Sequence, residues 1–372
     1  MTLKINLDSL QNKAKERTVK TQSIEYDLET LVKKILKGVI KLDPDYQRRH
    51  RWNNITSSKL IESLILNIPI PIIYLSYDID VDTNEEGARY SVIDGQQRLT
   101  AIVKFFENKF PLEGLDILED LEGCFYKDLP PFLLRRLEER TIKCLRIDST
   151  VDPQVKYDIF ERLNSGSVKL ESHELRNAVL RGEFNTKCKE LSKDENFRKL
   201  VQIPLDEAEH ESNSKVKKME DVELVLRFFA LIEDNYKSYK KSKEKQFKDF
   251  LSDSLEQKNK LDKEAIEKYA LVFKKTMKCI YDTFGELAFA KYKYIDGVLE
   301  KQSNFNAAVY DALTVAVATE INLDTPKIVA QKVIDFKDLF KNQTFFEYVN
   351  GSILDSNKLI NRIELARETI KQ

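Results

Sequence analysis

The feature that most constrains the fold is a polar turn at residues 94–98, Asp-Gly-Gln-Gln-Arg, which joins two segments of different periodicity. Before the turn, residues 90–93 have the apolar character of a strand. After it, apolar residues recur at the spacing of one helix face, namely Leu99, Ile102, Val103 and Phe106. A glycine at a strand-to-helix junction lets backbone N–H groups approach a ligand, and a helix N-terminus adds donors and a partial positive charge. The turn is therefore a candidate phosphate site.

The same turn also has an interpretation that needs no ligand. Asp94 and Gln97 have the spacing of a capping-box variant, which would simply start the helix. Gly95 would then serve the turn, and Arg98 would be a solvated surface residue. Against this, a cation in the first helical turn faces the unfavourable end of the helix dipole, at a cost of about 0.3–1 kcal/mol. The residues alone leave both interpretations open.

The composition favours a helix-rich protein and bears on whether its partner is a nucleic acid or a membrane. The 372 residues suffice for two or three domains, and the 61 basic and 62 acidic residues nearly cancel, so net charge does not point to a nucleic acid. The four cysteines are isolated, which predicts reduced thiols in a cytoplasmic protein. There is no signal peptide and no apolar run of the roughly 18–20 residues that a membrane span needs, so we expect no membrane partner.

The periodicity predicts an α+β fold with two dissimilar halves. A polar arm is predicted at residues 1–22, a mixed domain at residues 23–200 and a helical domain at residues 201–372. The elements predicted in the mixed domain are helices at 26–39, 56–68, 99–106, 131–139 and 152–164, an extended piece at 39–42, and strands at 70–77, 90–93 and 141–147. An acidic turn at 78–88 predicts that the first two strands form a hairpin.

Two segments are rich in basic residues. Between Tyr46 and Trp52 lie three arginines and a histidine, and arginines beside aromatic side chains suit contact with phosphate or nucleic acid. A solvated loop would explain the same run. Residues 236–248 contain six lysines with two tyrosines and a phenylalanine. We predict a solvated helix or loop there, with a nucleic-acid face as the less favoured interpretation.

Five blocks, in order, carry a resemblance to a known family. They are Pro44–Arg48 with Trp52, Ile68–Pro71, Asp94–Ile102, Phe160–Gly166 and Glu174–Ala178. Over roughly residues 25–240 their order and spacing resemble the N-terminal domain of GmrSD-type, modification-dependent restriction systems, and the Asp-Gly-Gln-Gln-Arg element is the specific part. The resemblance implies a ParB/sulfiredoxin-like mixed domain, followed in this chain by an all-helical C-terminal domain.

The resemblance also implies an activity, because in that family the Asp-Gly-Gln-Gln-Arg motif is described as binding and hydrolysing nucleoside triphosphates. The implied cofactors are magnesium and a nucleoside triphosphate. Asp94 would orient the metal or the attacking water, Gln97 or Gln96 would position that water, and Arg98 would pair with phosphate oxygens. The further phosphate-binding candidates are Gly95, Gln96, Gln47, Arg48, Glu161 and Asn164.

The chain departs from the family in its second half. Members often carry a C-terminal nuclease domain of the His-Asn-His type, whereas this chain has three histidines and none after His210. We therefore expect either a separate nuclease subunit or a protein that senses without cutting. DNA is an expected partner through Arg48, Arg49 and Arg51, and a homodimer is a further option.

Three hypotheses about function follow. The leading one is a nucleotide-binding and hydrolysing sensor component of a modification-dependent, anti-phage restriction system. The alternative is a non-catalytic ParB-like DNA-binding or adaptor module. A nuclease in the N-terminal domain is least favoured, because the carboxylates there are scattered and show no two-metal arrangement.

Overall fold

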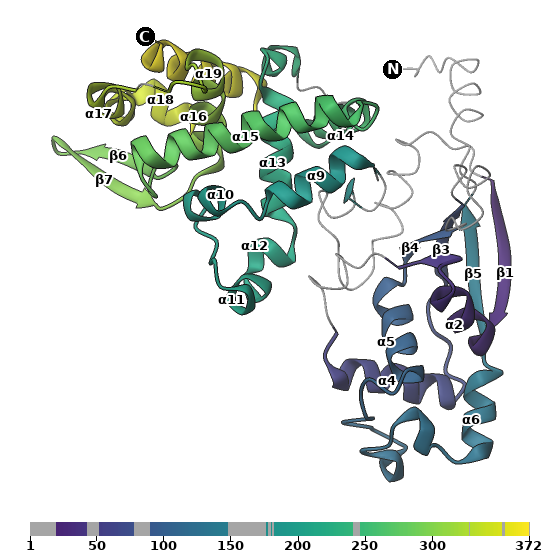
Figure 1. Cartoon of the computed structure of the whole chain (residues 1–372). Coiled ribbons are helices and arrows are strands. Elements are labelled where there is room, and N and C mark those ends of the chain that lie inside the picture. The colour runs from purple at the N-terminus through teal and green to yellow at the C-terminus, as the bar shows by residue number, and fades with distance from the viewer. Residues whose placement is uncertain are drawn as a thin grey trace, which may run out of the picture. The chain divides into compact units, whose positions relative to one another are not determined.

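The computed structural model describes residues 20–42, 52–77, 90–147, 176–177, 180, 182–240, 246–326, 328–351 and 354–371. The chain divides into two compact units after residue 170. The first unit contains a mixed sheet with helices and the second is mainly helical (Figure 1). The predicted α+β class is confirmed. No helix among the described residues has both the length and the apolar character needed to cross a membrane.

The first unit is built on a five-stranded mixed sheet. Its strands are β1 (Thr21–Asp27), β2 (Ile40–Lys41), β3 (Ile73–Tyr77), β4 (Tyr90–Asp94) and β5 (Thr141–Ile147), in the order β1-β5-β3-β4-β2. The β1–β5 and β3–β4 pairs are antiparallel, and the β3–β5 and β2–β4 pairs are parallel. The antiparallel β3–β4 pair confirms the predicted pairing of these strands. The helices are α2 (Leu28–Leu36), α4 (Asn54–Ile65), α5 (Gln96–Phe106) and α6 (Pro131–Glu138), with 3-10 turns η1 (Glu119–Leu121) and η2 (Tyr126–Asp128).

The strand–turn–helix predicted around residues 94–98 is present. Strand β4 ends at Asp94 and α5 begins at Gln96, with Gly95 between them. Leu99 and Ile102 on the predicted apolar face of α5 are fully buried. They share one core with the central strand β3, so the turn rests on the most buried part of this unit.

Strand β1 was not predicted, and it begins inside the range expected for a loose arm. Its residues are mostly exposed, with only Ile24 and Tyr26 partly buried. An edge strand with so few apolar side chains gives almost no signal of alternation. The rest of the predicted arm, residues 1–19, and the helix predicted at 152–164 lie outside the described residues.

The irregular segment that follows α5 is fixed by one buried carboxylate. Glu62 of α4 accepts hydrogen bonds from the backbone N–H groups of Asp116 at 3.2 Å, Ile117 at 2.8 Å and Leu118 at 2.7 Å. Burial alone would raise the pKa of Glu62, but the three donors outweigh it and hold the pKa below its ordinary value. The ionised carboxylate therefore stabilises this part of the first unit.

Replacing Glu62 with glutamine is expected to cost about 1.5–3 kcal/mol at neutral pH, the range for hydrogen bonds to a charged group. A depressed folded-state pKa contributes stability above the ordinary value of about 4.3, and this contribution is lost as the pH falls through the folded-state value. The difference in free energy of unfolding between wild type and Glu62→Gln should therefore shrink below about pH 4.

Urea unfolding followed by the fluorescence of Trp52, the single tryptophan of the chain, measures this difference. Glu122→Gln is the control, because this exposed carboxylate binds two N–H groups in the same segment. An equal loss in both variants would contradict the prediction.

The second unit consists of many helices and one hairpin. Its elements are α9 (Glu183–Leu191), α10 (Glu195–Leu200), α11 (Glu207–Ser212), α12 (Ser214–Lys217), α13 (Glu220–Leu231), η3 (Asn235–Ser238), α14 (Phe247–Lys258), α15 (Lys263–Phe284), β6 (Lys291–Ile295), β7 (Val298–Ser303), α16 (Ala307–Glu320), α17 (Ala330–Asp338), η4 (Leu339–Lys341), α18 (Gln343–Tyr348) and α19 (Ser356–Ile370). The helical character predicted for this half is confirmed, with the antiparallel β6–β7 hairpin as an addition. The hairpin turns at Asp296-Gly297, both with positive φ.

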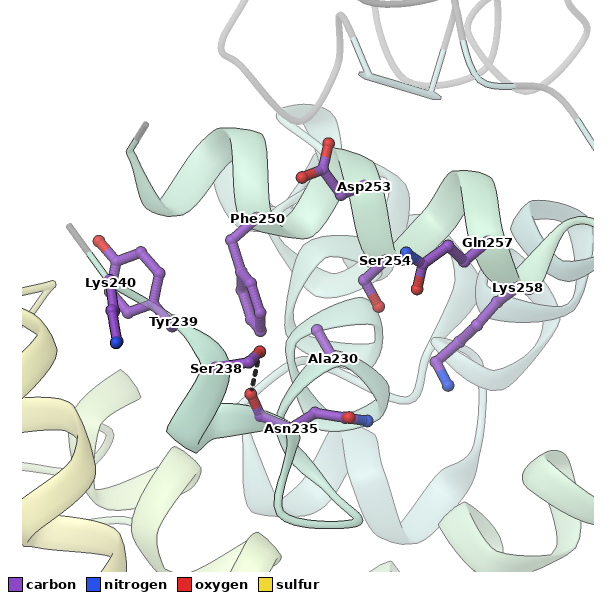
Figure 2. A pocket seen from close by; sticks show the side chains of 10 residues that line it. All are labelled: Ala230, Asn235, Ser238, Tyr239, Lys240, Phe250, Asp253, Ser254, Gln257 and Lys258. Carbon is purple, nitrogen blue, oxygen red and sulfur yellow. Dashed lines mark hydrogen bonds between the residues drawn. The ribbon is translucent and has the colours of Figure 1, made fainter. Parts of the chain in front are cut away.

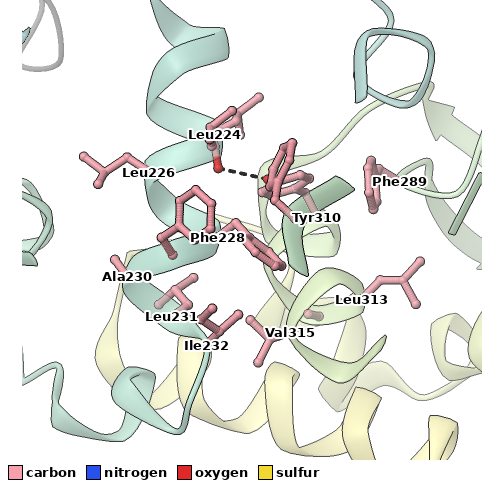
Figure 3. Packing of buried hydrophobic residues seen from close by; sticks show 14 of the residues in the cluster. Leu224, Leu226, Phe228, Ala230, Leu231, Ile232, Phe289, Tyr310, Leu313 and Val315 are labelled. Atoms are coloured by element: carbon pink, nitrogen blue, oxygen red, sulfur yellow. Dashed lines mark hydrogen bonds between the residues drawn. The ribbon is translucent and has the colours of Figure 1, made fainter. Parts of the chain in front are cut away.

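Helix α16 forms the centre of this unit. It is apolar on nearly all sides, as expected for a helix surrounded by others, and it packs against α13, α15 and α19. Figure 3 shows Phe228 of α13 beside Tyr310 of α16. The Tyr310 hydroxyl is buried and donates to the carbonyl of Leu224 at 2.9 Å.

The core of the second unit also contains an ionic triad. Asp311 of α16 receives a two-pronged contact from Arg227, at 3.0 and 2.5 Å, and a third hydrogen bond from Arg362 at 2.7 Å. Asp311 and Arg362 are fully buried, and the Arg227 side chain is 6% exposed. One carboxylate thus links helices α13, α16 and α19.

Residues 183–200, which the sequence analysis assigned to the mixed domain, pack in the second unit. Phe184, Cys188 and Phe197 of α9 and α10 belong to its core. The lysine-rich segment also differs from the prediction, because Tyr236 and Tyr239 are almost completely buried rather than solvated. The prediction of a solvated segment depended on its lysines, whereas the aromatic side chains between them contribute to the core.

Candidate functional site

The candidate site lies at the junction of β4 and α5. Gly95 is the residue before the helix and has φ 96° and ψ 10°, a left-handed conformation that favours glycine. A Cβ at this position would lie 2.3 Å from Ile73 Cδ1 in the central strand. The backbone conformation therefore favours glycine here, and an added Cβ would also force the buried Ile73 side chain to shift.

The capping-box interpretation does not describe this turn. No side-chain hydrogen bond caps α5 among the described residues. The Asp94 carboxylate instead accepts a hydrogen bond from Arg98 Nη2 at 2.6 Å. Arg98 is also not a solvated surface residue, since its side chain is only 11% exposed. In the described part of the chain, no side chain therefore occupies the N-terminus of α5, which is where an anion site would form.

The two charged groups of this pair differ in their access to solvent. The Asp94 side chain is 47% exposed, whereas Arg98 lies beneath it. Burial lowers the pKa of Arg98 and the nearby Asp94 carboxylate acts in the opposite direction, so the guanidinium stays charged at neutral pH. A phosphate approaching from solvent would therefore meet the carboxylate before the guanidinium.

Two other segments reach the turn from distant parts of the sequence. Arg98 Nη1 donates to the backbone carbonyl of Pro71. The Gln97 side-chain oxygen accepts from the backbone N–H of Trp52 at 3.3 Å, and its buried Nε2 has no hydrogen-bond partner in the described part of the chain. Three of the five blocks singled out in the sequence thus meet at one place. Gln96, the other predicted amide, is buried, with 7% of its surface exposed.

The remaining predicted site residues cannot be placed in the same way. Those outside the described residues are Gln47, Arg48, Arg49, Arg51, Glu161 and Asn164. Among the described residues, no group of three or more histidines, cysteines, aspartates or glutamates could hold a metal ion. Asp94 is therefore the one predicted metal ligand that the described structure places at the turn.

One residue in the last of the five blocks has a role that the sequence did not reveal. Arg176 is 1% exposed and donates to Ser252 Oγ, to Glu223 Oε2 and to the carbonyl of Lys248, each at 3.1 Å. All three partners lie on α13 and α14 of the second unit. This block therefore belongs to the second unit, and only its separation from the other blocks in sequence could have indicated that.

Residues 28–181 match the family model described as GmrSD restriction endonuclease, N-terminal domain. These residues form a GmrSD N-terminal domain. The match is shorter than the resemblance predicted over residues 25–240, and it includes the whole Asp94–Arg98 turn. The chain thus carries a domain of a restriction-system family. No curated protein and no solved structure matches the chain, so the ParB/sulfiredoxin-like fold of this GmrSD N-terminal domain stays a prediction.

Gly95→Ala is expected to destabilise the first unit by about 2–4 kcal/mol, because a left-handed alanine and an overpacked contact with Ile73 both cost free energy. Gly123→Ala is the matched control, since Gly123 also has a positive φ of 80° but has nothing within 4 Å of its added Cβ. Gly123→Ala should lower the free energy of unfolding by about 1 kcal/mol. Urea unfolding followed by Trp52 fluorescence compares the two variants. Equal losses would show that the contact with Ile73 is unimportant.

Proposed function

We propose that the GmrSD N-terminal domain binds a nucleoside triphosphate at the Asp94–Arg98 turn and hydrolyses it with magnesium, as the sensor component of a modification-dependent, anti-phage restriction system. The observation that carries this proposal is the position of the Asp94–Arg98 ion pair at the N-terminus of α5, which no side chain of the described residues caps. Backbone donors, a helix dipole and a guanidinium converge there, and phosphate binding draws on all three.

Phosphate recognition in this proposal begins with the backbone. Because Gly95 has no Cβ, phosphate oxygens can come close to the N–H groups at the start of α5. Arg98 uses one N–H for Asp94 and one for Pro71, and a guanidinium has five. Three of its N–H donors thus have no partner within the described residues, and a phosphate would have to reach them past the Asp94 carboxylate.

The exposed position of Asp94 favours a magnesium-bound nucleotide over a free one. A carboxylate at the entrance repels phosphate unless a cation lies between them. Magnesium is commonly held by one or two carboxylates together with substrate phosphates and water. Asp94 therefore fits as its protein ligand, and the metal would neutralise charge on the phosphates.

Gln97 is suited to position a water molecule. Its oxygen is held by Trp52, which fixes the orientation of the amide and leaves Nε2 without a partner among the described residues. The proposed DNA-binding residues Arg48, Arg49 and Arg51 come just before Trp52 in the sequence. Binding of DNA through these residues would affect the turn through the Trp52–Gln97 contact.

Phosphate release from ATP, GTP, CTP and UTP, with magnesium and with or without DNA, tests the proposed function. We expect turnover of at least one nucleotide that requires magnesium and changes when DNA is added. Nucleotide binding without turnover would favour the alternative, a non-catalytic DNA-binding or adaptor module. The closed Asp94–Arg98 pair supports that alternative, because two neutralised charges are also a stable resting arrangement. If the protein showed no nucleotide binding and no turnover, both hypotheses would be contradicted.

A further inference from the structure

The second unit has a pocket of its own, whose lining differs in chemical character from the turn of the first unit. It has a volume of ≈ 330 Å³ and lies between α14 and the segment that follows α13 (Figure 2). One wall is a single face of α14, with side chains at the spacing of successive helical turns: Phe250, Asp253, Ser254, Gln257 and Lys258. The opposite wall consists of Ala230, Asn235, Ser238, Tyr239 and Lys240.

The decisive group in this pocket is the ammonium of Lys258. The residue is only 8% exposed, and within the described part of the chain its ammonium makes no hydrogen bond or ion pair. Its nearest aromatic neighbour is Tyr269, with Nζ 4.1 Å from the ring centroid. The Tyr269 hydroxyl already donates to Glu233 at 2.9 Å. The Glu233 carboxylate offsets only part of the cost of burying this cation, so the ammonium can still attract an anion.

The other lining groups indicate what kind of anion fits. Asn235 and Gln257 carry amide donors, and Lys240 adds a second positive charge at the exposed side. The Ser238 hydroxyl is engaged, since it donates to the carbonyl of Asn235 at 2.7 Å. This set of donors is better matched to the three terminal oxygens of a phosphate than to the two of a carboxylate.

The volume and the apolar lining of the pocket indicate a ligand that is larger than an inorganic ion and has an organic part. A volume of ≈ 330 Å³ is at the small end of ligand pockets and many times that of a water molecule. The Phe250 ring and Ala230 supply an apolar wall. These features describe a molecule that has a phosphate and a ring.

We propose that this pocket binds a small organic phosphate of mononucleotide size, with Lys258, Asn235 and Gln257 contacting the phosphate and Phe250 contacting the ring. The pocket would then be a second ligand site, distinct from the triphosphate site proposed in the first unit. Burial lowers the pKa of Lys258, and a bound phosphate would oppose that effect. Ligand binding would also bridge α14 to the residues after α13.

Isothermal titration of the full chain with AMP, inorganic phosphate and adenosine tests this proposal, using wild type, Lys258→Met and Lys260→Met. Lys258→Met keeps a long side chain but removes the buried charge, so it should fold with at least the wild-type melting temperature. We expect it to weaken AMP and phosphate binding by about tenfold or more, equivalent to one charge-assisted hydrogen bond.

The matched control lies two residues further along the chain. The Lys260 side chain is 72% exposed and pairs with Glu256, so Lys260→Met should bind AMP as wild type does. Arg98→Ala should also bind AMP at this site, which separates it from the site in the first unit. Three outcomes would overturn the proposal: equal AMP affinity in wild type and Lys258→Met, adenosine binding as tight as AMP binding, or no binding of either phosphate probe at millimolar concentration.

Discussion

Arg98→Ala is expected to lower nucleoside-triphosphate turnover by about a thousandfold, the size of effect seen when a positively charged group at a transferring phosphate is lost. The side chain is 11% exposed and lies against Asp94, and the proposed function assigns it to the phosphate oxygens. Its removal would also leave the Asp94 carboxylate at the entrance without its partner. Phosphate release under saturating magnesium nucleotide measures the loss.

Two further variants distinguish the effects of charge and geometry on turnover from an effect of unfolding. Arg98→Lys keeps the positive charge but cannot form two parallel hydrogen bonds, so it should recover only part of the turnover. Arg135→Ala removes an exposed arginine from α6 of the same unit and should hydrolyse at the wild-type rate. Trp52 fluorescence reports whether each variant is folded. Wild-type turnover in a folded Arg98→Ala protein would show that the site has been assigned wrongly.

Asp311→Asn is expected to destabilise the second unit by about 3–5 kcal/mol, the range for a buried charge left without its partner. The change keeps the shape of the side chain and removes the negative charge that two buried arginines share. Since a whole domain is typically stable by about 5–15 kcal/mol, much of the helical structure should be lost under mild denaturing conditions. Far-UV circular dichroism in urea follows this loss, while Trp52 reports separately on the first unit.

The control for Asp311 is an ion pair on the surface of the same unit. Asp324 pairs with Lys275 and its side chain is 78% exposed, so Asp324→Asn should cost less than about 1 kcal/mol. A loss below 1 kcal/mol for Asp311→Asn would contradict the prediction. A large loss would measure the cost of leaving two buried arginines without their carboxylate partner. It would not measure the net contribution of the triad, because replacing all three members with apolar residues can be nearly neutral.

Local features of this protein could be predicted from its sequence, whereas contacts between distant residues could not. The strand at residues 90–94, the glycine turn and helix α5 are encoded within seventeen consecutive residues, and each gives a clear pattern. The capping alternative also depended on local spacing. It was the wrong alternative because Arg98, buried against β3 and its preceding segment, binds the Asp94 carboxylate.

The contacts that complete the candidate site depend on the tertiary fold. The sequence separation is 45 residues for the Trp52–Gln97 contact and 27 for the Pro71–Arg98 contact. In the ionic triad, Arg227 and Arg362 are separated from Asp311 by 84 and 51 residues. No periodicity or propensity relates such positions. Strand β1 was missed for a different reason, because its exposed edge carries too few apolar residues.

The position of Arg176 has a consequence for how such proteins can be recombined. The matched domain ends at residue 181, yet the guanidinium of Arg176 is satisfied by Glu223, Ser252 and the carbonyl of Lys248. A hybrid that joined this domain to a different partner module would have to supply a carboxylate, a hydroxyl and a carbonyl for that guanidinium. A junction near residue 170, where the two compact units divide, would instead keep Arg176 together with its three partners.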